Sequence, residues 1–159
     1  MSKAVLFSIK PKYCELIASG KKKIEVRKTK PKLDTPFKCY IYCTKDFYRA
    51  GNGYFQGKYC GKVIGEFVCD TIITDRTFGH DPMFKALACM SDAEIAGYCT
   101  ANEMYGFHIS DLVIYDKPKE LSELEKPHEY IYKSYRKQNS FFKGITRPPQ
   151  SWCYAEELI

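Results

Sequence analysis

The chain has 159 residues, enough to bury roughly two-thirds of the surface that its unfolded form would expose, so it can fold without disulfides or a metal. Hydrophobic residues make up 45% and charged residues 28%, which excludes a disordered or a membrane-spanning chain. The apolar run at residues 4–7 is too short for a signal-peptide core. We therefore expect one domain, residues 1–159, located in the cytoplasm and without membrane contact.

Positive charge is concentrated in the first quarter of the chain. The net charge is +6, and residues 1–38 hold eleven lysines and arginines against three aspartates and glutamates. A local excess of this kind favours an anionic partner such as nucleic acid, because each cation near a phosphate releases condensed counterions. A solubilising basic face explains the same charge equally well.

The eight cysteines do not form a metal-binding pattern. Only Cys39 and Cys43 lie close together, and no two cysteines are separated by two residues. In a cytosolic protein such cysteines are reduced and buried like small hydrophobic residues. We expect neither a metal nor a cofactor.

The first predicted elements are a strand and a short helix. Residues 4–9 form an apolar strand that fits a core. Residues 11–20 follow as a helix, because Pro11 suits a first helical position and Gly20 a left-handed end. From Lys22 the pattern changes from the helical to the strand period, which predicts a second strand.

Two more strands follow, over residues 37–44 and 62–73, and Gly65 predicts a bulge in the latter. Three glycines and an asparagine in residues 49–57 predict a loop between them. A helical insertion is predicted around residues 80–104, where Ser91 and Glu94 have capping-box spacing.

The last third of the chain predicts two strands separated by an excursion. The first strand covers residues 105–116, and an ordered excursion across the surface is expected around residues 117–144. Residues 147–159 predict a closing strand, because Pro148 and Pro149 prevent a helix before it.

Five or six short strands with short flanking helices predict a mainly β (α+β) fold. A small closed or half-closed β-barrel fits this pattern, because closure removes exposed strand edges. An open α+β sheet is the alternative.

Lys22, Glu25 and Arg27 are the main candidates for a functional site. Glu25 and Arg27 share one strand face, which Lys22 can reach from the strand entrance. In a cleft, Arg27 would hold a phosphate or a base bidentately and Glu25 would accept from an exocyclic amine. Lys22 would supply charge or act as a base or nucleophile. The plain alternative is a structural ion pair between Glu25 and Arg27.

Three other residues are expected beside the same cleft. Ser8 and Lys10 lie at the end of the first strand, and Thr44 lies at the end of the third. A threonine at a strand end is also a common turn residue.

The remaining polar and aromatic candidates have structural interpretations that we favour. Glu66 is expected to point outward from its strand, and His108 to pack or hydrogen-bond rather than catalyse. Trp152 is expected in the core, although it could stack on a base, as could Tyr40, Tyr42 or Tyr54. The aromatic residues of the excursion suit either single-stranded RNA or attachment to the barrel; they are Tyr130, Tyr132, Tyr135, Phe141 and Phe142.

One motif and the order of the elements around it resemble the ASCH domain of the PUA-like superfamily. The motif is G-x-K-x-x-E-x-R, and its fixed positions are filled by Gly20, Lys22, Glu25 and Arg27. The segments "SIKP", "YIYCT" and "GKVIGEF" and the late aromatic strand complete the likeness, which spans residues 3–116 and 145–159.

The resemblance implies a compact PUA-like barrel with the helix and the motif strand beside a cleft. It also implies association with RNA, through direct binding or recognition of modified nucleosides. One similar subfamily hydrolyses the amide of N(4)-acetylcytidine with a lysine, a threonine and a glutamate. Lys22 matches that lysine, whereas Glu25 stands at the threonine position.

Three functions are therefore open. The first is an RNA- or nucleotide-binding module whose basic cleft is lined by Lys10, Lys22, Glu25, Arg27 and Thr44. The second is an amidohydrolase acting on a modified nucleoside such as N(4)-acetylcytidine, with Lys22 and Glu25 as catalytic residues. The third is a recruitment module whose basic face binds an acidic protein. The sequence indicates no stable protein partner.

Overall fold

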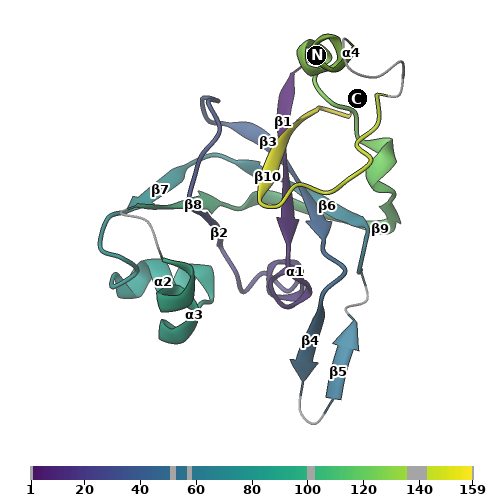
Figure 1. Cartoon of the computed structure of the whole chain (residues 1–159). Coiled ribbons are helices and arrows are strands. Elements are labelled where there is room, and N and C mark those ends of the chain that lie inside the picture. The colour runs from purple at the N-terminus through teal and green to yellow at the C-terminus, as the bar shows by residue number, and fades with distance from the viewer. Residues whose placement is uncertain (1, 51–52, 57–58, 100–102, 136–142, 159) are drawn as a thin grey trace.

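Figure 1 shows the computed structural model of the chain, which describes residues 2–50, 53–56, 59–99, 103–135 and 143–158. Its larger sheet has five strands, in the order β10 (Trp152–Glu156), β1 (Lys3–Ile9), β3 (Phe37–Cys43), β6 (Val63–Cys69) and β9 (Ser110–Lys119). β1 and β3 are parallel, and the other neighbours are antiparallel. The interior strand β1, between β10 and β3, is buried on both faces, which explains its unbroken apolar run.

A smaller sheet contains β2 (Ile24–Arg27), β8 (Met104–His108) and β7 (Ile72–Asp75), in that order. The chain passes between the two sheets at residues 70–71, between β6 and β7, and again at Ile109, between β8 and β9. The ring of Phe107 on β8 packs 5.0 Å from that of Phe7 on β1, at 64°. Two sheets around one core give the mainly β, barrel-like fold that the sequence predicted.

The two corners explain where the sequence-based strand boundaries were wrong. The strand predicted over residues 62–73 is divided into β6 and β7, and the strand over 105–116 into β8 and β9. Each corner is only one or two residues long, so the strand-like residues on its two sides were taken together as one strand. The irregularity predicted at Gly65 is confirmed, because a Cβ there would lie 2.3 Å from the Val113 carbonyl oxygen and the register shifts beside it.

The loop predicted over residues 49–57 is also wrong for most of those positions. A hairpin of β4 (Phe47–Ala50) and β5 (Gly53–Gln56) occupies this part of the chain. Gly53 is the first residue of β5, and Gly51, Asn52 and Gly57 lie outside the described residues.

The first helix, α1 (Pro11–Ala18), begins at the predicted proline, and Gly20 follows it with a φ of 74°. Figure 1 shows α1 and α4 (His128–Tyr135) at opposite ends of β1, with both chain termini near α4. The end of the sheet that carries α1 is therefore well separated from the termini.

Two short helices occupy the predicted insertion around residues 80–104. They are α2 (Pro82–Ala88) and α3 (Asp92–Tyr98), and the capping box of Ser91 and Glu94 is confirmed at the start of α3. Phe84 and Ile95 of these helices pack against Ile24 of β2 in one buried cluster. The insertion thus covers one face of β2.

The predicted excursion around residues 117–144 contains the end of β9, a short 3-10 helix at Leu121–Glu123 and α4. Leu121, Leu124 and Ile145 are buried in a second cluster against Leu6 and Tyr40 of the main sheet. The excursion therefore covers the sheet face opposite the main core. The side chains of Tyr132 and Tyr135, and all of Phe141 and Phe142, lie outside the described residues.

No helix in the described ranges has the length and apolar character needed to span a bilayer. All eight cysteines are free, and Cys14, Cys39, Cys43 and Cys69 are buried.

Candidate functional site

A cleft of about 860 Å³ opens at the α1 end of the fold. It is lined by all six residues that the sequence placed beside it: Ser8, Lys10, Lys22, Glu25, Arg27 and Thr44. Because β1 and β3 are parallel, the ends of both strands reach the same edge of the sheet. The Thr44 amide donates to the Ile9 carbonyl at 2.9 Å, which joins these two strand ends beside the cleft.

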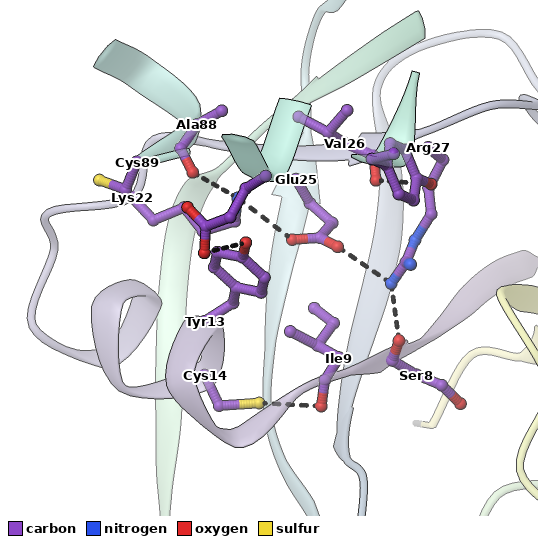
Figure 2. A network of polar contacts seen from close by, with 12 residues as sticks. Ser8, Ile9, Tyr13, Cys14, Lys22, Glu25, Val26, Arg27, Ala88 and Cys89 are labelled. Atoms are coloured by element: carbon purple, nitrogen blue, oxygen red, sulfur yellow. Dashed lines mark hydrogen bonds and ion pairs between the residues drawn. The ribbon is translucent and has the colours of Figure 1, made fainter. Parts of the chain in front are cut away.

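Lys22, Glu25 and Arg27 form one buried charged group, shown in Figure 2. Arg27 Nη2 lies 2.9 Å from Glu25 Oε1, and Lys22 Nζ lies 3.7 Å from Glu25 Oε2. Exposed fractions are 3% for Lys22, 4% for Glu25 and 9% for Arg27. The ion pair between Glu25 and Arg27 therefore exists, but it is a buried pair and not a solvated one.

The trio is buried because each face of β2 is covered by a different element. Helices α2 and α3 cover Ile24 and Val26, whereas the opposite face looks toward α1 and the end of β1. The turn after α1 brings Lys22 to that side: the amides of Lys21 and Lys22 both donate to the Leu16 carbonyl at 3.0 Å.

Each cation of the trio has further partners that fix its position. Arg27 Nη2 donates to the Ser8 carbonyl at 2.7 Å, and its guanidinium carbon lies 5.4 Å from the centre of the Phe7 ring. Lys22 Nζ donates to the Ala88 carbonyl at the end of α2 at 2.7 Å and lies 4.7 Å above the Tyr13 ring. Hydrogen bonds and cation–π contacts of this kind hold rotamers in place.

Burial also changes the acid–base behaviour of Lys22. Removal from water lowers the pKa of its amine, and the Glu25 carboxylate opposes this change without cancelling it. At a given pH, a larger fraction of a lysine with a lowered pKa is in the neutral amine form than of a lysine with the ordinary pKa.

Three buried polar atoms at the cleft have no hydrogen-bond partner within the described part of the chain. They are the Ser8 hydroxyl Oγ, the second carboxylate oxygen Oε2 of Glu25 and the Arg27 Nε–H group. An unpartnered buried polar group costs on the order of 1–3 kcal/mol, and such groups are rare in folded proteins. The three residues that carry these atoms all line the cleft.

Helix α3 forms a wall of the cleft that sequence reasoning did not find. Glu94 accepts a hydrogen bond from Tyr13 Oη at 3.0 Å and pairs with Lys12. Burial raises the pKa of Glu94, but hydrogen bonds from Lys12, Ser91 and Tyr13 outweigh it and lower that pKa to about 2. The capping-box spacing identified Glu94 as a helix residue only, and nothing in the sequence placed it against α1.

The charge of the cleft is more balanced than the sequence suggested. Four cations and three carboxylates line it: Lys10, Lys12, Lys22 and Arg27 against Glu25, Asp46 and Glu94. The excess positive charge lies on flanking lysines such as Lys21 and Lys23, which are exposed. The interior of the cleft therefore carries charges of both signs, and most of the excess positive charge lies around it.

The other candidates do not join this cleft. Glu66 pairs with Lys38 at 3.0 Å on the main sheet, and His108 Nδ1 lies 2.6 Å from Asp70 Oδ1 at the corner between the sheets. Tyr40 and Tyr42 are buried, and the Tyr54 side chain lies outside the described residues. Trp152, expected in the core, is only half buried, and it packs against the main core with part of its surface.

Comparisons with known proteins identify relatives by structure only. No family model and no curated protein matches the sequence. The structure is similar to the crystal structure of an ASCH protein from Zymomonas mobilis, with a TM-score of 0.65 and 18% identity over 97% of this chain and 88% of that one. A tyrosine-to-phenylalanine variant of that protein matches with a TM-score of 0.65 and 18% identity over 98% of this chain and 92% of that one. A serine-to-alanine variant matches with a TM-score of 0.65 and 19% identity over 97% and 89%.

Proposed function

Because the chain has the ASCH fold, we propose that it is an RNA- or nucleotide-binding module whose cleft receives a nucleobase beside Lys22, Glu25 and Arg27. The observation that carries this proposal is that three residues lining one cleft each have a buried polar atom without a hydrogen-bond partner in the described part of the chain. A ligand that enters the cleft can use this hydrogen-bonding capacity, and the fixed positions of the three residues lower the cost of binding it.

The chemistry of the three atoms favours a base edge with an amine next to an acceptor. Glu25 Oε2 would accept from the exocyclic amine of cytosine, adenine or guanine. Arg27 Nε would donate to the adjacent ring nitrogen or carbonyl oxygen, and Ser8 Oγ can serve either role. Uracil has no exocyclic amine, so it would leave the Glu25 oxygen unpaired.

A second function, hydrolysis of an acylated nucleoside, has one observation in its favour. The lowered pKa of Lys22 makes a neutral amine more accessible, which a base or nucleophile requires. Lys22 and Glu25 would then be the catalytic residues. The 3% exposure of Lys22 and its hydrogen bond to Ala88 favour the binding role, because they tie the amine to the protein.

The first experiment measures binding of RNA to the protein. Single-stranded RNA oligomers of about 8 nucleotides, either cytidine-only or uridine-only, are titrated into the protein. We expect the cytidine oligomer to bind about tenfold more tightly, because one good base contact gives about 1–3 kcal/mol of discrimination. Equal affinity, or no binding of either oligomer, would contradict the proposal.

N(4)-acetylcytidine distinguishes the two functions. A binding module releases no acetate from it under single-turnover conditions and loses affinity for RNA as salt rises. Release of acetate by the parent protein, abolished in Lys22→Ala, would establish the hydrolase instead.

A further inference from the structure

A second hollow, of about 450 Å³, runs along the edge strand β10 and is distinct from the cleft. We call it the aromatic groove, and we define it by Tyr130, Trp152 and Tyr154 together with Lys126 and Arg147. The Trp152 and Tyr154 rings meet edge to face at 5.4 Å and 79°, and the Tyr130 ring stacks on Tyr154 at 6.1 Å and 23°. Three aromatic rings thus line one hollow near the surface.

The polar edges of two of these rings are anchored by the lysine-rich stretch that follows β2. Trp152 Nε1 donates to Thr29 Oγ1 at 3.0 Å, and Tyr154 Oη accepts from the Lys32 amide at 2.8 Å. Anchored edges fix the orientation of the rings, so they form a rigid stacking platform.

The charge of the aromatic groove is positive. Lys126 and Arg147 line it, and no acidic residue does so among the described residues. Lys3 Nζ lies 5.6 Å above the Tyr154 ring, and its ion pair with Glu129 at 2.7 Å holds it there. Aromatic rings interleaved with cations suit a polyanion that also carries flat faces, which describes a single-stranded nucleic acid.

Shared lining residues link the aromatic groove to the cleft through a third hollow. A third hollow, of about 380 Å³, shares Pro149 with the aromatic groove and shares Ser8 and Thr44 with the cleft. The chain between them is held by a hydrogen bond from the Ser8 amide to the Ser151 carbonyl at 3.0 Å. A ligand that fills the cleft can therefore extend over residues 148–150 into the aromatic groove.

We propose that the ligand is a single-stranded oligonucleotide, and that a nucleotide flanking the one in the cleft stacks in the aromatic groove. This inference rests on the proposed function of the cleft and adds the class of ligand. Lys126 and Arg147 would contact the phosphates between the two bases. A free nucleoside or mononucleotide would occupy the cleft alone.

Trp152 is the only tryptophan of the chain, and its fluorescence reports directly on the groove. Mixed-sequence single-stranded octamers of RNA and of DNA (about 8 nucleotides) are titrated while tryptophan emission is followed, in parallel with a mixture of ribonucleoside monophosphates. We expect an octamer to quench the emission and the monophosphates to bind without quenching it. Binding of both octamers without any change in emission would overturn the inference, as would quenching by a glutamate-rich peptide alone.

Substitutions separate this inference from the proposed function. Tyr130→Ala should weaken octamer binding about tenfold, because stacking is worth about 1–3 kcal/mol per base. Arg147→Gln should weaken octamer binding through the loss of a phosphate contact, and both variants should leave monophosphate binding unchanged. Phe78→Ala is the matched control, since Phe78 is 54% exposed and lines none of the three hollows. Parent-like octamer binding by both groove variants would overturn the inference. Failure of the proposed function looks different, because the monophosphates would then not bind at all.

Discussion

Arg27 Nη2 donates a hydrogen bond of 2.7 Å to the Ser8 carbonyl, while the Ser8 hydroxyl and the Arg27 Nε–H beside this bond have no partner in the described part of the chain. The two residues are thus joined by one hydrogen bond, while one further polar atom of each has no hydrogen-bond partner in the described part of the chain. Firm positioning with unused hydrogen-bonding capacity is what a preorganised binding site requires.

Ser8→Ala removes an unpartnered hydroxyl and touches no hydrogen bond of the fold. We expect its free energy of unfolding to equal or exceed that of the parent, because a buried polar atom without a partner is lost. RNA affinity should fall about fivefold if the hydroxyl contacts the ligand, by a net hydrogen bond of about 1 kcal/mol. Urea unfolding and RNA titration measure the two effects; a loss of stability with intact binding would show a structural hydroxyl.

Arg27→Met removes one partner of the buried pair. We expect the free energy of unfolding to fall by on the order of 3–5 kcal/mol, since Glu25 is left as an uncompensated buried charge. Arg76→Met is the control, because the ion pair between Arg76 and Glu103 is exposed and its removal should matter far less. Equal effects of the two substitutions on urea unfolding would mean that burial does not strengthen the Arg27 interaction.

Lys22 predicts a specific dependence of stability on pH. Its folded-state pKa lies below the ordinary value of 10.5, mainly because of burial, so between these two values the unfolded chain binds the additional proton. The contribution of Lys22 to the free energy of unfolding therefore rises with pH. It is lowest below the folded-state pKa, where Lys22 is protonated in both the folded and the unfolded chain. Relative to Lys22→Met, the parent should gain stability as the pH rises toward 10.5.

Lys21→Met controls for the titration of other groups, because Lys21 is exposed. Its pH profile of stability is the baseline against which the Lys22→Met profile is compared. A constant difference between the Lys22→Met profile and this baseline would show that the pKa of Lys22 is not lowered by folding.

The flanking lysines should determine the salt dependence of binding. Lys21 and Lys23 are exposed, and Lys28 Nζ lies 4.8 Å above the ring of Tyr98, which lines the cleft. Replacing all three with glutamine should lower the slope of log affinity against log salt by about 2, since each phosphate contact to a single strand contributes about 0.7. Lys117→Gln on β9 is the control. An unchanged slope in the triple variant would show that these three lysines do not contact the phosphates of the bound RNA.

Much of the cleft could be predicted because its residues follow local rules. Strand periodicity placed Glu25 and Arg27 on one face, and the matching strand ends placed Lys10 and Thr44 beside them. Burial of the trio was not predictable, because it depends on contacts with distant residues: Phe7 and Ser8 beside Arg27, and Tyr13 and the Ala88 carbonyl beside Lys22. Periodicity also could not detect the corners at residues 70–71 and Ile109, because one or two residues between strands are too few to interrupt the pattern.

The parts that sequence reasoning missed depend on contacts between distant residues. Tyr13 and Glu94 are separated by 81 positions, and Trp152 and Thr29 by 123. The alternation around Trp152 indicated a strand. That Trp152 also lines a groove is visible only from its tertiary neighbours. Helix-capping spacing likewise indicated the start of α3 without indicating what α3 faces.

The most direct test observes the Arg27 Nε–H itself. In the ¹H–¹⁵N spectrum this resonance can be assigned by its loss in Arg27→Met, and the exposed Arg76 provides an internal comparison. On saturation with the cytidine oligomer, we predict that the Arg27 Nε–H resonance shifts downfield, because the donor gains the partner it lacks in the free protein, while the Arg76 resonance stays in place. An unmoved Arg27 resonance with the oligomer fully bound would show that the ligand does not enter the cleft, and would contradict the function proposed for Lys22, Glu25 and Arg27.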